Sequence, residues 1–131
     1  MKKIFLPLLL LGFLSCSEHS ELSHSDHPFH PKWSKSSNIY EVNIRQYTPE
    51  GTFSAFQNHL PRLKKMGVDI LWLMPIQPIG KIKRKGILGS YYSISDYTAI
   101  NPEFGSEPDF LELVSNAHKL GLKIILDWVP N

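Results

Sequence analysis

The sequence has little cysteine, no excess of charge of either sign and no long hydrophobic run. Its one cysteine, Cys16, excludes an internal disulfide framework and a cysteine-based zinc site. Lys and Arg total 14 against 12 Asp and Glu; residues 1–15 hold two lysines and no acid, so the remainder carries no net charge. We therefore expect no nucleic-acid binding driven by net charge. At 131 residues, 42% hydrophobic and 20% charged, the chain is long enough for one ordinary globular domain.

The amino terminus has the features of an export signal. Two lysines precede an apolar run, residues 4–14, which ends at Ser15 and Cys16. As a helix this run would rise about 16 Å, too short for a hydrocarbon core of about 30 Å. We therefore expect residues 1–15 to be a signal peptide, and simple cleavage with free secretion is one outcome. The position of the cysteine resembles the lipobox of bacterial lipoproteins, which implies lipidation of Cys16 and an exported, membrane-anchored protein at the cell surface or in the periplasm.

Residues 16–37 are rich in Ser, His and Pro, which predicts a flexible tether between the export signal and a folded part at residues 38–131. Four histidines fall within twelve residues and allow a metal-binding hypothesis: His19, His24, His27 and His30. Their spacing matches no closed ligand set, so a solvated linker is the favoured interpretation.

From residue 38 onward, the apolar pattern predicts alternating strands and helices. Strands are expected at Ile39–Tyr47, at Asp69–Ile76, where both faces should be buried, and at Leu122–Val129. Helices are expected after Thr52, with a bend but no break at Pro61, and after the capping sequence Ser106-Glu107-Pro108-Asp109. The βαβαβ order favours an α/β fold with a parallel sheet, either doubly wound or a (β/α)8 barrel. No G-x-G-x-x-G follows the first strand, so the main dinucleotide-binding signature is lacking.

Residues that suit a ligand site follow the predicted strands. Asp127 and Asn131 come at the end of the third strand, where side chains of parallel α/β folds meet ligands, although an ion pair and a turn residue would explain them as well. The connection 77–105 is too long for a structural turn. It carries tyrosines and an aspartate that suit a sugar ring or could simply pack the loop: Tyr91, Tyr92, Asp96 and Tyr97. Its basic residues predict a solvated tip without chemistry: Lys81, Lys83, Arg84 and Lys85.

Glycoside hydrolysis needs a pair of carboxyl groups about 5–5.5 Å apart for retention or about 6.5–9.5 Å apart for inversion. Asp96 and Asp127 are the acids near the expected site, and their spacing does not identify such a pair.

Four segments together resemble the first three strands of the α-amylase family, glycoside hydrolase family 13. They are IYEVNIRQYTPEGTF, GVDILWLMPIQPIG, GSYYSISDYTAINPEFG and GLKIILDWVPN. The resemblance implies a (β/α)8 TIM barrel, incomplete in this chain and represented by its first three βα units. It also implies action on α-glucosidic bonds of starch-like glucans, with retention through a glycosyl-enzyme intermediate.

The resemblance assigns roles to four residues. Tyr92 matches the tyrosine that stacks under the glucose ring at the cleavage subsite, and Asp127 the aspartate that supports the catalytic centre by hydrogen bonding. Asn131 matches an asparagine that is a calcium ligand in many members and pins a loop in others, so calcium is a candidate cofactor and no other is expected. Asp96 matches an aspartate in the family's loop that carries this tyrosine. In this chain that loop is the connection 77–105, called the tyrosine loop below, and we expect a structural role for Asp96.

The catalytic carboxylates of the family lie on later strands, so the resemblance places them beyond Asn131 and none in this chain. We therefore expect an amino-terminal fragment of a longer enzyme, inactive by itself. Two alternatives remain open. One is a non-catalytic tethered glucan-binding protein that uses Tyr92, and the other is a transglycosylase or branching member of the family.

Overall fold

The structure is a computed structural model and describes residues 30–130. The described part forms one compact unit from Pro31 onward. The predicted export signal, Cys16 and Asn131 lie outside the described residues. None of the described helices has the length and apolar character that crossing a membrane requires.

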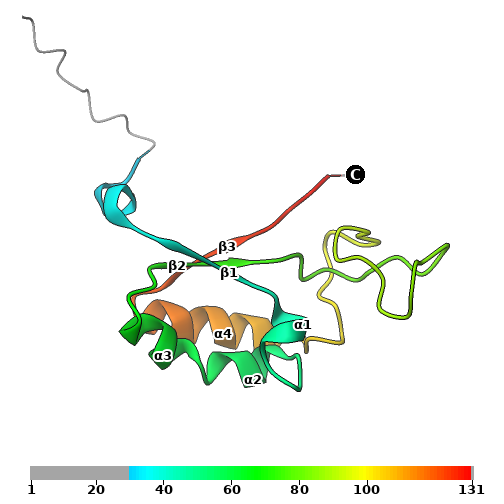
Figure 1. Cartoon of the computed structure of the whole chain (residues 1–131), viewed down its shortest axis with the longest axis horizontal. Coiled ribbons are helices and arrows are strands. Elements are labelled where there is room, and N and C mark those ends of the chain that lie inside the picture. Colours follow the sequence, from blue (N-terminus) through cyan, green and yellow to red (C-terminus); the bar gives the residue numbers. More distant parts are fainter. Residues whose placement is uncertain (1–29, 131) are drawn as a thin grey trace, which may run out of the picture. The chain divides into compact units, whose positions relative to one another are not determined.

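Three parallel strands form the sheet, in the order β1-β2-β3 (Figure 1). The strands are β1 (Ile39–Val42), β2 (Ile70–Leu73) and β3 (Lys123–Leu126), each shorter than predicted. In the register, Ile70 of β2 is aligned with Ile39 on one side and with Lys123 on the other. The carboxyl ends of the three strands therefore lie at one edge of the sheet.

The helices cover one face of this sheet (Figure 1). They are α1 (Ile44–Tyr47), α2 (Phe53–Gln57), α3 (Leu60–Lys65) and α4 (Glu107–Lys119). The core lies between this face and the helices, where Leu71 and Leu73 of β2 are fully buried with Phe53, Phe56 and Leu113. This burial provides most of the favourable free energy of folding.

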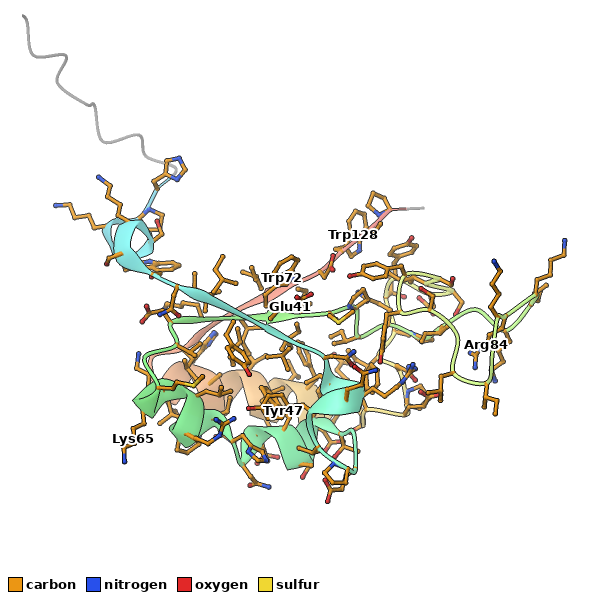
Figure 2. All side chains as sticks on the ribbon, in the orientation of Figure 1. Glu41, Tyr47, Lys65, Trp72, Arg84 and Trp128 are labelled. Carbon is orange, nitrogen blue, oxygen red and sulfur yellow. The ribbon has the colours of Figure 1, made fainter. Side chains whose placement is uncertain are left out.

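The opposite face of the sheet carries side chains that no described element covers. Trp72 of β2 is 36% exposed, and Figure 2 shows it beside Glu41 of β1 on the side away from the helices. The prediction that the second strand is buried on both faces therefore holds, among residues 30–130, only for the helix side. Ile125 of β3, which is aligned with Trp72, is exposed on this face as well.

Besides the lengths of the strands, two predictions about the elements were wrong. The strand predicted at Ile39–Tyr47 ends at Val42, and Ile44–Tyr47 form the short helix α1. Val42 and Ile44 alternate as in a strand, but Ile44 and Tyr47 are three residues apart, which places them on one face of a helix and on opposite faces of a strand.

The helix expected to bend at Pro61 is instead interrupted, and α2 ends at Gln57 before α3 begins at Leu60. Pro61 has no N–H to donate to the carbonyl of Gln57, four residues earlier, whereas its place in the first turn of α3 needs no such bond.

The start of α4 agrees with the predicted capping sequence. The Ser106 hydroxyl accepts the backbone N–H of Asp109, and the Asp109 carboxylate accepts the backbone N–H of Ser106 at 2.7 Å. This reciprocal pair satisfies two N–H groups that a helix start leaves without intrahelical partners.

Part of the predicted tether belongs to the compact unit. Residues Lys32–Ser36 form a 3-10 helix, η1, and the Lys123 ammonium lies 5.6 Å from the ring centre of Trp33. The Asn38 side chain donates to the carbonyl of Gly67 at 2.7 Å.

Candidate functional site

The candidate site lies at the carboxyl edge of the sheet, where the segment after β3 meets the long connection 77–105. This connection contains no helix or strand, and its two sides form one isolated antiparallel bridge between Ile79 and Ile94. The last part of the connection is held against the segment that follows β2, because the Asn101 N–H donates to the Ile76 carbonyl at 2.8 Å.

Tyr92 of the connection and Asp127 after β3 lie together. The Tyr92 hydroxyl donates to Oδ2 of Asp127 at 3.0 Å, and the Tyr92 side chain is 38% exposed. This hydrogen bond is the main cause that raises the pKa of Tyr92 above its ordinary value of 10.0. The phenol therefore keeps its proton at neutral pH and stays a donor. The structure thus brings together the two residues that sequence analysis assigned to substrate binding.

Tyr97 makes a second contact with the segment that follows β3. Its hydroxyl donates to the carbonyl of Val129 at 2.9 Å, and its ring lies 5.4 Å from that of Trp128. Trp128 is itself 57% exposed and stands near the end of the chain in Figure 2. Tyr92 and Tyr97 therefore fix the tyrosine loop to residues 127–129.

Asp96 is engaged within its own turn. One of its carboxylate oxygens accepts the backbone N–H of Thr98 at 2.8 Å and the Thr98 hydroxyl at 2.7 Å. These hydrogen bonds, from the side chain first and the backbone second, lower the pKa of Asp96. The contacts organise the loop and do not bring Asp96 to Asp127.

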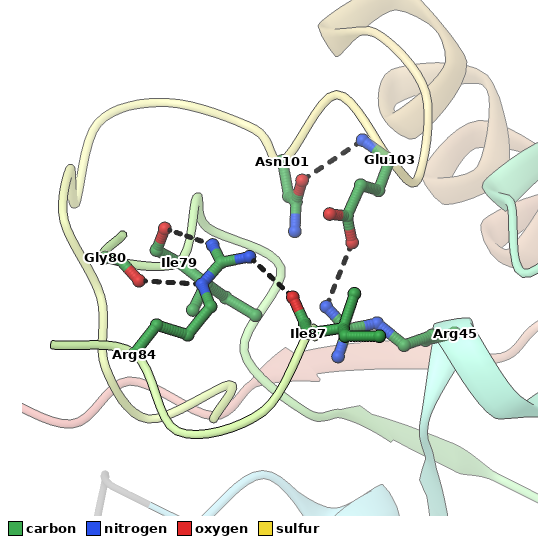
Figure 3. A network of polar contacts seen from close by, with 7 residues as sticks. All are labelled: Arg45, Ile79, Gly80, Arg84, Ile87, Asn101 and Glu103. Atoms are coloured by element: carbon green, nitrogen blue, oxygen red, sulfur yellow. Dashed lines mark hydrogen bonds and ion pairs between the residues drawn. The ribbon is translucent and has the colours of Figure 1, made fainter. Parts of the chain in front are cut away.

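The prediction of a solvated basic tip was wrong for Arg84. Its guanidinium group donates to the carbonyls of Ile79 at 2.9 Å, Gly80 at 3.0 Å and Ile87 at 3.1 Å (Figure 3). A planar group with five N–H donors can satisfy three carbonyls of a turning backbone at once. Arg84 therefore holds the tip of the loop together, while Lys81, Lys83 and Lys85 are exposed.

Sequence analysis missed Arg45 at this site. Its Nη2 lies 3.0 Å from Oε2 of Glu103, and its guanidinium carbon lies 4.5 Å from the ring centre of Tyr91. Figure 3 shows the pair with Asn101, whose side-chain oxygen accepts the backbone N–H of Glu103 at 3.1 Å. Arg45 and Glu103 are 58 residues apart, so no local pattern reveals the pair.

Metal binding is not supported by any cluster in the described part. Between His30 and Pro130, no group of three or more His, Cys, Asp or Glu side chains is arranged to hold a metal ion. Asn131 and three of the four tether histidines fall outside these residues, so calcium binding at Asn131 stays a prediction and the solvated linker stays the favoured interpretation of the histidines.

The arrangement defines a class of protein before any comparison. Strands in sequential order, helices on one face and polar residues at the carboxyl edge match the start of a (β/α)8 barrel. A doubly wound sheet has helices on both faces and a reversal of strand order, and the described residues show neither feature.

Comparison with known proteins identifies the family. The model of the alpha-amylase catalytic domain matches residues 23–131, so the chain belongs to the alpha-amylase family. It is similar to an alpha-glucosidase of Apis mellifera, at 39% identity over 71% of this chain and 16% of the relative. It is also similar to an alpha-1,4-glucan:maltose-1-phosphate maltosyltransferase of Rhodospirillum rubrum, at 39% identity over 67% of this chain and 15% of the relative.

Solved structures agree with the fold. The crystal structure of an alpha-amylase from Lactobacillus plantarum matches with a TM-score of 0.69 and 50% identity, over 70% of this chain and 22% of that chain. The predicted fold, the first βα units of a TIM barrel, is therefore confirmed. The chain spans about a fifth or less of the length of these relatives.

Proposed function

We propose that the chain is the amino-terminal part of the catalytic barrel of an exported glycoside hydrolase that acts on α-glucosidic bonds of starch-like glucans with retention. Membership of the alpha-amylase family supports the reaction class. The small share of each relative that the chain covers supports its being part of a longer enzyme.

The contact between Tyr92 and Asp127 is the observation that carries this proposal. It fixes an exposed aromatic ring beside a carboxylate at the catalytic edge of a barrel sheet. A glucose unit offers an apolar C–H face that can pack on the ring, and hydroxyl groups that can donate to the carboxylate. In this proposal Tyr92 positions the sugar and Asp127 orients both the tyrosine and the sugar.

The catalytic carboxylates belong, in this proposal, to the part of the enzyme beyond Asn131. Retention needs two carboxyl groups about 5–5.5 Å apart. Of the predicted site acids, Asp96 is engaged with Thr98 and Asp127 with Tyr92. These two side chains therefore suit positioning better than nucleophilic attack or proton transfer.

Substitution of Tyr92 in the full-length enzyme tests the proposal. We expect Tyr92→Ala to lower kcat/KM on maltopentaose by at least about tenfold, because the sugar loses its stacking surface. Tyr92→Phe keeps the ring and serves as the matched control, with a smaller loss. Unchanged kinetics of Tyr92→Ala would contradict the proposed role of this residue.

A transferase of the same family is a second candidate, because one of the relatives is a maltosyltransferase. Product analysis on maltooligosaccharides separates the two: hydrolysis gives shorter sugars and new reducing ends, whereas transfer also gives longer sugars. Glucan binding without any product would favour the non-catalytic alternative.

The proposal includes a lipid anchor at the amino terminus. Lipidation of Cys16 would hold the enzyme at a membrane surface, either at the cell surface or in the periplasm, and a Cys16→Ser variant should leave the membrane fraction.

The proposal also includes calcium as a cofactor. Asn131 would supply one of the six to eight oxygens that Ca²⁺ requires. A lower melting temperature in EDTA, restored by calcium, would support the metal.

A further inference from the structure

Arg45 contacts the loop that carries Tyr92 at two places, Glu103 and Tyr91. It belongs to α1, directly after β1, and its side chain is only 13% exposed. Its charge is paired with Glu103, whose side chain is 49% exposed and which belongs to the last part of the connection 77–105 (Figure 3). The pair therefore joins the first βα unit to the far end of the tyrosine loop.

The guanidinium group of Arg45 also contacts two aromatic rings. Its central carbon lies 4.5 Å from the ring centre of Tyr91 and 5.8 Å from that of Phe104. Phe104 is 1% exposed, and Tyr91 packs against the core. A cation over the face of an aromatic ring is attracted by the electrons of the ring, so Arg45 restrains the Tyr91 side chain.

Tyr91 and Tyr92 are consecutive, so a restraint on one limits the backbone of the other. The far end of Tyr92 is held by Asp127 through the hydroxyl group, at 3.0 Å. Arg45 restrains the near end through Tyr91. The ring of Tyr92 is therefore fixed from both sides although the loop has no regular secondary structure.

We propose that Arg45 is a positioning residue for glucan binding, which holds Tyr92 in place through Tyr91 and Glu103. This inference rests on the proposed function, in which Tyr92 binds the sugar. Arginine is required because one planar group must stack on Tyr91 and donate to Glu103 at the same time. Lysine carries the same charge as a compact point and cannot do both.

Kinetics of Arg45→Lys in the full-length protein test the inference. We expect kcat/KM on maltopentaose to fall about tenfold, mainly through a higher KM, with a melting temperature within a few degrees of the wild type. Arg84→Lys is the matched control, since the same substitution at an arginine of the loop itself acts on the carbonyls of Ile79, Gly80 and Ile87 and not on Tyr91. Its kcat/KM should stay within about twofold of the wild type.

A double-mutant cycle separates positioning from general stability. If Arg45 acts through Tyr92, Arg45→Lys should have no further effect on kcat/KM in a Tyr92→Ala background. The same loss in both backgrounds, or wild-type kinetics of Arg45→Lys, would overturn the inference while the proposed function stands. An inactive wild type, or a Tyr92→Ala variant as active as the wild type, would overturn both.

Glu103→Gln provides a second variant should Arg45→Lys fail to fold. It removes the ion pair, keeps the stacking on Tyr91, and changes a half-exposed side chain. We expect a smaller rise in KM, which disappears in the Tyr92→Ala background. A rise in KM that persists without Tyr92, or no rise at all, would count against the inference.

Discussion

At the scale of single residues, the contact between Tyr92 and Asp127 joins two parts of the chain that are 35 residues apart. The donor is a neutral phenol and the acceptor is a carboxylate, so the hydrogen bond favours the protonated form of Tyr92. The charge of Asp127 acts in the same direction. Both the position and the pKa of the tyrosine therefore depend on Asp127.

This dependence predicts the titration of Tyr92. In the wild type, the phenol should lose its proton at a pH above the ordinary value of 10.0, and in Asp127→Asn the pKa should fall back toward that value, because the charged acceptor is gone. Carbon NMR of labelled tyrosine in the full-length protein measures the shift, with Tyr92→Phe to assign the signal. Equal titration in the wild type and in Asp127→Asn would show that the hydrogen bond does not form in solution.

Tyr92 and Asp127 could be predicted as site residues from the sequence, whereas Arg45 could not. Asp127 follows an apolar strand, and several tyrosines sit in a connection too long to be only a turn, so general rules for parallel α/β folds point to both. The resemblance to the α-amylase family then singles out Tyr92 among these tyrosines. Arg45 comes after β1, in a stretch whose sequence predicted that the strand continues. Its partner Glu103 becomes a neighbour only when the loop folds back.

At the scale of elements, α4 shows how much a local pattern can determine. Its capping sequence, its apolar stripe and the glycine after it agree on one helix, and the structure has that helix at Glu107–Lys119. The other elements were less certain, because apolar residues in short segments satisfy strand and helix spacings alike. That ambiguity explains the wrong end of the first strand, whereas the interruption before α3 follows from Pro61, which has no N–H to donate to the carbonyl of Gln57.

The cap of α4 predicts a local loss of stability in Ser106→Ala. Removal of the hydroxyl should reduce the protection of the first-turn amides against hydrogen exchange by about 1 kcal/mol. Ser115→Ala is the matched control, because Ser115 lies exposed in the middle of the same helix and alanine is a good helix former. A similar loss of protection in both variants would contradict the capping role.

The same cap has a pH dependence of known sign. The hydrogen bonds that Asp109 accepts from Ser106 hold the pKa of Asp109 below its ordinary value of 3.8. The contribution of Asp109 to the stability of α4 is therefore complete above that value. It is lost as the pH falls through the lower pKa that Asp109 has in the folded state. We expect the protection of the α4 first turn to decline only in acid below pH 3.8 and not to change with pH in Asp109→Asn. A decline already at neutral pH would contradict this assignment.

At the scale of the whole molecule, the described sheet has one covered face and one that is not. Trp72 and Ile125 are exposed on the uncovered face, at 36% and 43%, and Leu126, on the other face at the end of β3, is 41% exposed. β3 also has no strand on its outer side among the described residues. Apolar side chains and unpaired backbone groups in this arrangement favour association with other chains.

Residues 17–131 expressed alone should therefore be insoluble or lack a cooperative unfolding transition. The covered face alone gives the segment a small core, while the other face and the edge of β3 stay in water. Thermal unfolding followed by circular dichroism, together with gel filtration, provides the measurement. A soluble monomer with a sharp cooperative transition would contradict the expectation.

The intact mass of the native protein from its source cells tests most directly whether the chain is part of a larger glucan-active barrel. We predict a mass far above the 15.0 kDa of this sequence, with a lipid increment on the peptide that contains Cys16. A native mass at or below 15.0 kDa would contradict the proposed hydrolase. Glucan binding through Tyr92 would then be the function to test.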